Sequence, residues 1–225
     1  MNNLFIDLET IKCTNQDNID YIISKIKPNH ACKTSESKQK SIDSQSNSVI
    51  DKTVFDGHWG KIITIGFAIN DSSPISLQLG IDEDTEKDLI QAFFDYLAKI
   101  AEGENKDSQF LMLKWIAHHK DFDLKFLFKR CVINNINTHG IRIPHNDRHG
   151  TQRVFCTMQE WNGFGTKAGG SLDSICKVLG IEGKKGFCGS DVWDAWERGE
   201  FKRIADYCKD DVMSTRAVYN RMELR

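Results

Sequence analysis

The chain has 225 residues, of which 40 % are hydrophobic and 28 % charged, the composition of an ordinary globular protein. Its formal net charge of −2 neither requires nor excludes a nucleic-acid partner. No run approaches the ~18 apolar residues of a membrane span. No basic segment precedes an apolar one at the N-terminus, so we expect an intracellular, cytoplasmic protein without a membrane partner.

Seven cysteines are scattered along the chain without a Cys-x-x-Cys pair or a regular spacing. Such a set is typical of reduced intracellular proteins, and it favours small buried thiols over disulfides or a structural zinc site. The length suits one substantial core, so we expect a single domain over residues 1–225.

The first part of the chain predicts three strands of an antiparallel meander. Residues 4–9 have the pattern of a short buried strand, and residues 61–70 that of a second strand rich in β-branched side chains. Residues 74–79 supply a third strand after the turn sequence Asn-Asp-Ser-Ser. The second and third strands should therefore form a hairpin.

A polar segment separates the first two strands. Residues 29–48 are dense in Ser, Lys, Gln and Asn and contain few apolar anchors, which predicts a flexible insertion. Residues 18–26 before it have apolar side chains at helical spacing, which predicts a short helix. The insertion is either a partner-binding segment or a tolerated loop.

Helices and one further strand fill the rest of the chain. A capping box at Thr85 predicts a helix that continues to residue 101, and residues 110–117 predict a buried strand followed by a helix over residues 122–130. Two more helices are expected at residues 172–179 and 201–222. This order of elements predicts an α/β fold, with one mixed sheet flanked by helices.

The first strand carries two carboxylates, Asp7 and Glu9, in an otherwise apolar sequence. Side chains alternate along a strand, so both carboxylates project from the same face. Two like charges held side by side stay ionised only with a positive partner, and a divalent cation is the usual one. A solvated strand edge explains this short pattern equally well.

Two further acidic motifs accompany later elements. Asp123 follows the predicted strand at residues 110–117, where a carboxylate points at the carboxyl edge of the sheet. Tyr207 and Asp211 are four residues apart and therefore share one face of the last helix. Taken alone, each acid has a simpler explanation, either as a helix-capping residue or as part of a solvated helix face.

Together and in this order, the motifs resemble those of the DEDD superfamily of 3′-5′ exonucleases. That superfamily has Asp-x-Glu on a first strand, an acid in His-x-x-x-Phe-Asp, and a closing motif that is either Tyr-x-x-x-Asp or His-x-x-x-x-Asp. The interval from Tyr207 to Asp211 is similar to the tyrosine subclass, DEDDy, because the position a histidine would need is Asp206. The resemblance implies a ribonuclease H-like fold, in which an antiparallel meander continues into parallel strands.

The segment 171–215 narrows the resemblance to proteins related to the exonuclease domain of family B DNA polymerases. The resemblance covers most of the chain apart from residues 13–56. Where these proteins usually have His-Asn, this chain has His118 and His119, and we expect the residue at 119 to alter substrate contact. Where Asp-Thr-Met is common, the chain has Cys156-Thr157-Met158.

The resemblance also implies a catalytic site. Asp7 would bridge two metal ions, Glu9 and Asp211 would complete the site of the water-activating ion, and Asp123 would serve the other ion. Tyr207 would orient the attacking water, since a free pKa near ~10 makes it a poor base at neutral pH. Hard oxygen ligands favour Mg²⁺, with Mn²⁺ as a substitute.

Contacts with the substrate strand are expected from cationic, histidine and aromatic side chains placed outside the acidic cluster. Each such side chain is individually more often part of a solvated surface or of the core. The candidates are Lys61, His118, His119, Phe164, Lys184 and Lys185.

These motifs predict a 3′-5′ exonuclease that hydrolyses phosphodiester bonds at the 3′ end of single-stranded DNA by a two-metal mechanism and releases nucleoside 5′-monophosphates. The same chemistry on RNA is the alternative, because nothing in the motifs reads the 2′-hydroxyl. A non-catalytic nucleic-acid-binding module is the third class, but such a module would have no use for all four acids and the tyrosine.

Overall fold

The computed structural model describes residues 2–103, 112–146, 153–163, 170–182 and 186–224. The strands are Asn2–Ile11 (β1), Lys61–Ile69 (β2), Ile75–Gln78 (β3), Leu113–Ala117 (β4) and Val154–Cys156 (β5). The helices are Gln16–Ser24 (α1), Ser35–Asp51 (α2), Glu86–Gly103 (α3), Lys120–Ile133 (α4), Thr157–Trp161 (α5), Leu172–Leu179 (α6), Val192–Glu197 (α7) and Phe201–Met222 (α8). Short 3₁₀ helices occupy Lys52–Phe55 (η1) and Gly189–Asp191 (η3).

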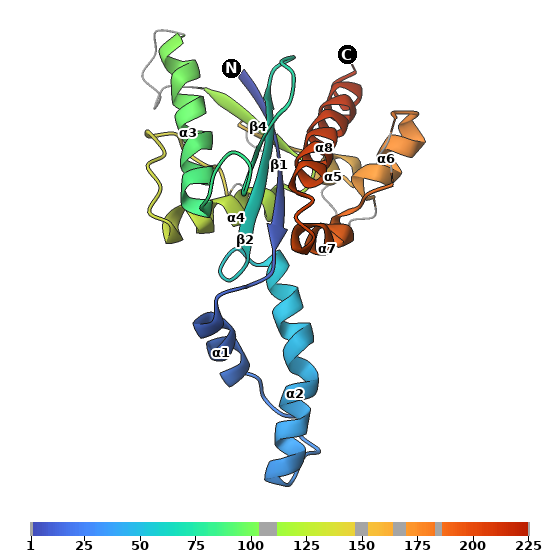
Figure 1. Cartoon of the computed structure of the whole chain (residues 1–225). Helices are drawn as coiled ribbons and strands as arrows, with labels where there is room; N and C mark the ends of the chain where they lie inside the picture. The colour runs from blue at the N-terminus through green and yellow to red at the C-terminus, as the bar shows by residue number, and fades with distance from the viewer. Residues whose placement is uncertain (1, 104–111, 147–152, 164–169, 183–185, 225) are drawn as a thin grey trace.

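The five strands form one mixed sheet in the order β3-β2-β1-β4-β5 (Figure 1). β1, β2 and β3 are antiparallel neighbours, whereas β4 runs parallel to β1 and β5 runs parallel to β4. The predicted α/β class, with an antiparallel meander that continues into parallel strands, is confirmed. β1 is therefore central, with hydrogen-bonded neighbours on both sides.

Helices cover both faces of this sheet. Gly66 of β2 faces Cys208 of α8, whereas the next residue, Phe67, packs edge-on against Phe93 of α3. Because successive side chains of a strand point to opposite faces, α3 and α8 lie on opposite sides of the sheet. The face under α3 is filled by fully buried aliphatic and aromatic side chains and forms most of the main core.

A buried ion pair ties the core helices to the sheet. Glu86, at the start of α3, accepts two hydrogen bonds from the guanidinium group of Arg130 in α4 and one from the backbone N–H of Ile62 in β2. A buried carboxylate is costly unless it is paired and hydrogen-bonded, and Glu86 has both kinds of partner. The contact fixes α4, which carries Asp123, relative to β2.

Residues 12–52 project from the core as an arm built from α1 and α2 (Figure 1). The insertion predicted to be flexible at residues 29–48 is helical over most of its length, because α2 begins at Ser35. Thr34 and Ser37 form a capping box, and Lys40 pairs with Glu36 one turn earlier. These local contacts support a helix even though it has few apolar side chains to bury.

The other predicted elements are present, with shifted ends. β1 extends beyond the expected residues 4–9, and α1 begins two residues before 18. β4 begins at Leu113, and residues 110 and 111 of the predicted strand lie outside the described residues. The last helix and the helix over residues 172–179 have the predicted bounds, and Ser171 caps the latter. Sequence patterns missed β5, α5 and α7, which are too short to show a clear period. Within the described residues, none of the helices has the length and apolar character needed to cross a membrane.

Candidate active site

Asp7 and Glu9 lie on the central strand β1, on the face covered by α8. In the antiparallel register Asp7 pairs with Gly66 and Glu9 with Thr64, and the register shifts directly after Glu9. Glu9 is buried, and Asp7 keeps part of its surface exposed. The alternation expected from the sequence therefore places both carboxylates on one side, next to the last helix.

α8 approaches the sheet closely at this point because of a glycine. A Cβ atom added to Gly66 would lie 2.7 Å from the Sγ of Cys208 and 3.0 Å from its carbonyl oxygen. The missing side chain lets α8 rest on β2, which brings Tyr207 and Asp211 to the carboxylates of β1. Tyr207 and Asp211 are both buried, so neither belongs to a solvated helix face.

Asp123 enters from a third element, in the first turn of α4. Its side chain is only 3 % exposed, and burial raises its pKa to about 8, with a smaller contribution from the negative charge of Asp211. Hydrogen bonds from the backbone N–H groups of His119, Asp123 itself and Leu8 oppose this rise. The bond from Leu8 joins Asp123 to β1 between Asp7 and Glu9.

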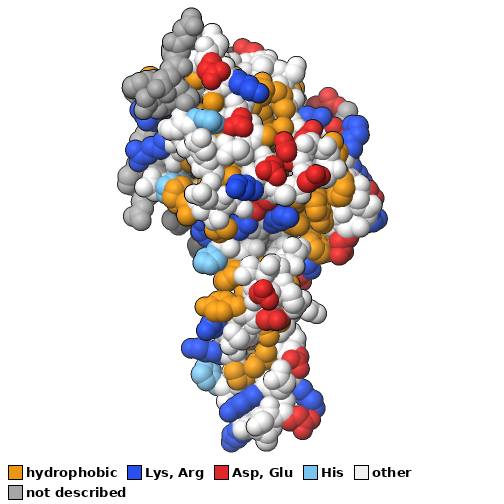
Figure 2. All heavy atoms as spheres, turned by 60° about the vertical axis from the view of Figure 1, so that its left-hand side comes forward, with side chains coloured by type: hydrophobic (Ala, Val, Ile, Leu, Met, Phe, Trp, Pro, Cys, Tyr) orange, Lys and Arg blue, Asp and Glu red, His pale blue; other side chains and the backbone are white. Residues whose placement is uncertain are grey.

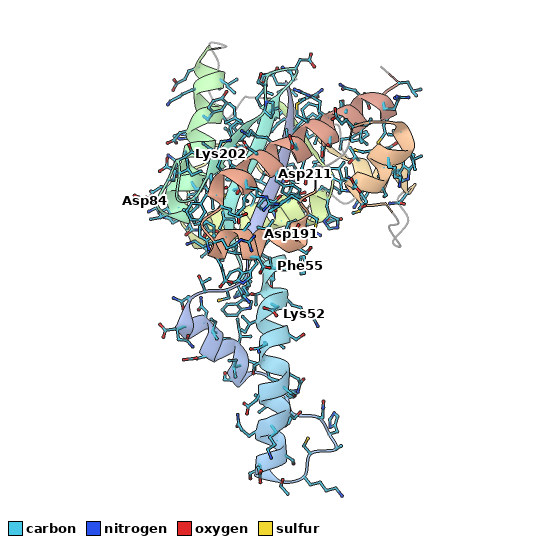
Figure 3. All side chains as sticks on the ribbon, turned by 45° about the vertical axis from the view of Figure 1, so that its right-hand side comes forward. Lys52, Phe55, Asp84, Asp191, Lys202 and Asp211 are labelled. Carbon is cyan, nitrogen blue, oxygen red and sulfur yellow. The ribbon has the colours of Figure 1, made fainter. Side chains whose placement is uncertain are left out.

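The pKa of Asp7 shows how closely the four acids gather. Burial raises this pKa well above its ordinary value, and the negative charges of Asp211, Glu9 and Asp123 raise it further. Carboxylates repel one another in this way only when they are near neighbours in a poorly solvated site. Three buried acids and Asp7 thus form one cluster at the end of the sheet, and Asp211 is labelled in Figure 3.

The donor set of this cluster fits a divalent cation. Carboxylate oxygens are the hard ligands that Mg²⁺ and Mn²⁺ prefer, and a cation would relieve the mutual repulsion that raises the pKa of Asp7. Ligand atoms of Asp7, Glu9 and Cys208 all lie within 4.8 Å of one another.

Cys208 is a neighbour of the cluster that sequence patterns missed, because its apolar spacing in α8 predicts a core residue. Its thiol lies 3.4 Å from Oδ2 of Asp7 and 3.5 Å from the backbone carbonyl oxygen of the same residue. Burial and the surrounding carboxylates raise the pKa of this thiol, so it stays protonated and donates to Asp7. It therefore helps to orient that carboxylate.

Tyr207 is fixed by packing and by a hydrogen bond to Asp211. Its ring meets that of Phe187 edge-on at 4.8 Å, and the guanidinium group of Arg203 lies over Phe187. Burial raises the pKa of the hydroxyl, and the negative charges of Glu9, Asp211 and Asp7 raise it further. The hydroxyl is therefore a hydrogen-bond donor and not a base.

The expected substrate-contact residues have mixed positions. His119 caps α4 by accepting a hydrogen bond from the N–H of Phe122, and Nδ1 of His118 lies 2.9 Å from the hydroxyl of Thr157. Lys61 begins β2 opposite Ile11, at the base of the arm. Substrate contact by these three residues stays a prediction. Phe164, Lys184 and Lys185 lie outside the described residues.

Comparisons with family models, curated sequences and solved structures relate these features to known proteins. Residues 53–225 match a family model described as a predicted 3′-5′ exonuclease related to the exonuclease domain of PolB, whereas no curated protein sequence matches the chain. Among solved structures, the chain is similar to the family B DNA polymerase from the hyperthermophilic archaeon Pyrobaculum calidifontis, with a TM-score of 0.57 and 12 % identity.

That similarity covers 100 % of this chain and 24 % of the polymerase chain, so the chain spans about a quarter of that protein's length. At this level of identity the likeness shows the fold. The expected ribonuclease H-like fold is confirmed, with the similarity extending over β1 and the arm as well as the segment that the family model matches.

Proposed function

The chain belongs to the family of predicted 3′-5′ exonucleases related to the exonuclease domain of PolB, and from this premise we propose that it shortens single-stranded DNA from its 3′ end by phosphodiester hydrolysis. The observation that carries the proposal is the convergence of four carboxylates and Tyr207 from β1, α4 and α8. Gathering buried acids costs free energy, which metal binding offsets. A module that only held nucleic acid would gain nothing from this arrangement.

Two divalent ions, Mg²⁺ with Mn²⁺ as a substitute, would supply an activated water at neutral pH and compensate the charge on the attacking and leaving oxygens. Asp7, Glu9, Asp211 and Asp123 would hold these ions, with Asp7 serving both, Glu9 and Asp211 one, and Asp123 the other. The thiol of Cys208 holds Asp7 in place from the side of α8.

The remaining step that the chain's own residues perform is to aim the water. The hydroxyl of Tyr207 donates its one proton to Asp211, so it directs the water by accepting a hydrogen bond from it at the phenol oxygen and does not act as a base. The packing of its ring on Phe187 limits its rotation. The water oxygen forms a bond to phosphorus and the P–O3′ bond breaks, so the terminal residue leaves as a nucleoside 5′-monophosphate and O3′ takes up a proton to become the new 3′-hydroxyl.

RNA is the second candidate substrate, because carboxylates that bind metal ions act on the phosphodiester and do not distinguish a 2′-hydroxyl from a hydrogen. The test uses 5′-labelled DNA and RNA strands of one sequence, incubated with Mg²⁺, Mn²⁺ or EDTA and resolved by length. We expect a metal-dependent ladder that shortens from the 3′ end, with DNA as the better substrate.

Matched variants make the test specific. Asp7→Ala and Asp211→Asn should abolish the ladder, with a loss of at least about 10³-fold in rate, because each removes a metal ligand. Asp210→Asn changes the same charge one residue away on the exposed side of α8 and should leave the rate unchanged. If folded Asp7→Ala and Asp211→Asn proteins hydrolyse the strand at the native rate, the proposal is wrong.

A further inference from the structure

An aromatic side chain stands exposed at the point where the arm joins the core. Phe55, the last residue of η1, is 73 % exposed. Figure 3 labels it together with Lys52 at the base of the arm, below Asp211 of α8. Single exposed apolar side chains are common, so its position relative to the acidic cluster decides whether it matters.

Two hydrogen bonds fix η1 to the end of β1. The hydroxyl of Thr10 donates to the carbonyl oxygen of Val54 at 2.8 Å, and the N–H of Cys13 donates to the hydroxyl of Thr53 at 2.8 Å. Thr10 directly follows Glu9 in the chain. The 3₁₀ helix that ends at Phe55 is therefore attached to the segment of the chain that directly follows Glu9.

The other side of the ring meets α4. Its centroid lies 6.5 Å from that of Phe122 in an edge-on arrangement, and Phe122 immediately precedes Asp123. Phe55 is thus bracketed by the two segments that carry Glu9 and Asp123, while most of its surface remains open to solvent. A rigid, exposed aromatic ring beside a phosphodiester site is a platform on which a base can stack.

The charges around this ring suit a polyanion. Lys52 is exposed and makes no ion pair with any described residue, and the acid beside the ring, Asp56, is neutralised by Lys129. The arm as a whole contains seven lysines against five acids, although the complete chain is slightly negative. In Figure 2, Lys and His side chains follow the left-hand edge of the arm.

We propose that the base of the arm binds the substrate strand next to its 3′ end, with Phe55 stacking on a base and Lys52 contacting the phosphate backbone. This inference rests on the proposed function for its choice of occupant. An apolar protein partner fits less well, because Lys52 is exposed in the same 3₁₀ helix and the segments that hold the ring also carry Glu9 and Asp123.

The experiment measures binding of a labelled single-stranded DNA of about twelve nucleotides. Ca²⁺ replaces Mg²⁺, so that the carboxylates are satisfied without the octahedral ion that catalysis is expected to use. Phe55→Ala should weaken binding by at least about fivefold, the lower limit for loss of one stacked base. Phe55→Trp should bind as tightly as the native chain, and circular dichroism confirms that each variant is folded.

Matched controls separate these effects from general surface changes. Val178 is also 73 % exposed, on α6, and Val178→Ala should leave affinity unchanged. Lys52→Ala should weaken binding and reduce the slope of log affinity against log salt by about 0.7, the value for one contact to single-stranded phosphate. Lys99→Ala, at an exposed position of α3, should change neither quantity.

The binding and hydrolysis measurements separate failure of the inference from failure of the proposed function. If Phe55→Ala binds and trims the strand as the native chain does, the inference is overturned even though the exonuclease remains. If the native chain binds the strand with the expected variant pattern but never shortens it in Mg²⁺, the proposed function fails and the inference stands. Absence of any binding, or an equal loss in Val178→Ala, also overturns the inference.

Discussion

At the scale of single residues, the cluster combines charged groups with neutral groups that orient them. Asp7 accepts a hydrogen bond from the thiol of Cys208, and Asp123 accepts hydrogen bonds from backbone N–H groups. These bonds fix the orientation of each carboxylate. Tyr207 differs from them because burial and negative neighbours keep its hydroxyl protonated. We expect the acids to bind the metal ions and Tyr207 to orient the attacking water.

Tyr207→Phe tests that division of roles. The ring and its packing on Phe187 are retained, so the free energy of unfolding should change by less than about 1 kcal/mol. Loss of the hydroxyl should lower kcat at least about a hundredfold with little change in KM, as for removal of one positioned donor. The measurement is single-strand trimming under saturating Mg²⁺. A KM effect alone would contradict the assigned role.

At the scale of elements, the site depends on how closely α8 rests on the sheet. Gly66 has an ordinary backbone conformation, so its value lies in its small size and not in conformational freedom. The thiol and the carbonyl of Cys208 occupy the space above it. The same contact brings the thiol of Cys208 to Asp7. The geometry of the acidic cluster therefore depends on the distance between α8 and β2.

Gly66→Ala should therefore disturb both stability and activity. The added Cβ would lie 2.7 Å from Sγ of Cys208, which forces α8 outward and costs about 1–3 kcal/mol of unfolding free energy. Thermal unfolding and trimming rates measure the two effects. Gly103→Ala, where a Cβ meets nothing within 4 Å, is the control and should not destabilise. Equal behaviour of the two variants would rule out the close approach.

The element scale also explains why the helix α2 was not predicted. Composition predicted a flexible insertion at residues 29–48, yet a capping box at Thr34 and spaced pairs such as Glu36 with Lys40 start a helix. Low hydrophobicity removes the core-facing stripe by which helices are usually found in sequence. Local hydrogen bonds and ion pairs supply the helix signal instead.

At the scale of the whole molecule, three elements far apart in sequence deliver like charges to one end of the sheet. The pKa values of Asp7 and Asp123 are raised, so the folded chain binds these protons more tightly than the unfolded chain does. Stability from these groups is fully present below the ordinary pKa near 3.8 and is lost as pH rises toward about 8 for Asp123.

The expected consequence is a metal-linked pH dependence of stability. In EDTA the Tm should fall between pH 5 and 8, by about 2–4 °C for each ~1 kcal/mol of unfolding free energy lost. Asp123→Asn should flatten the dependence, and Mg²⁺ should raise Tm most at the alkaline end, because bound cations stabilise only the folded state. Calorimetry in EDTA and in Mg²⁺ measures this. A Tm that rises with pH in EDTA would contradict the raised pKa values.

The sequence by itself determined the class of fold, most helices and strands, and the five residues that form the cluster. Periodicity fixes which side chains share a face, which is why Asp7 with Glu9, and Tyr207 with Asp211, could be paired without coordinates. The order of motifs then carried the resemblance. Short elements such as β5 and α7 were missed because they complete too few periods.

Only the tertiary structure decided how these local faces meet. The approach of α8 at Gly66, the thiol of Cys208 beside Asp7, and the exposure of Phe55 between β1 and α4 all join residues distant in sequence. A sequence pattern reports the period within one element, whereas the distance between two elements is set by packing of side chains that the pattern does not relate. The acids were therefore visible in the sequence, and the groups that orient them were not.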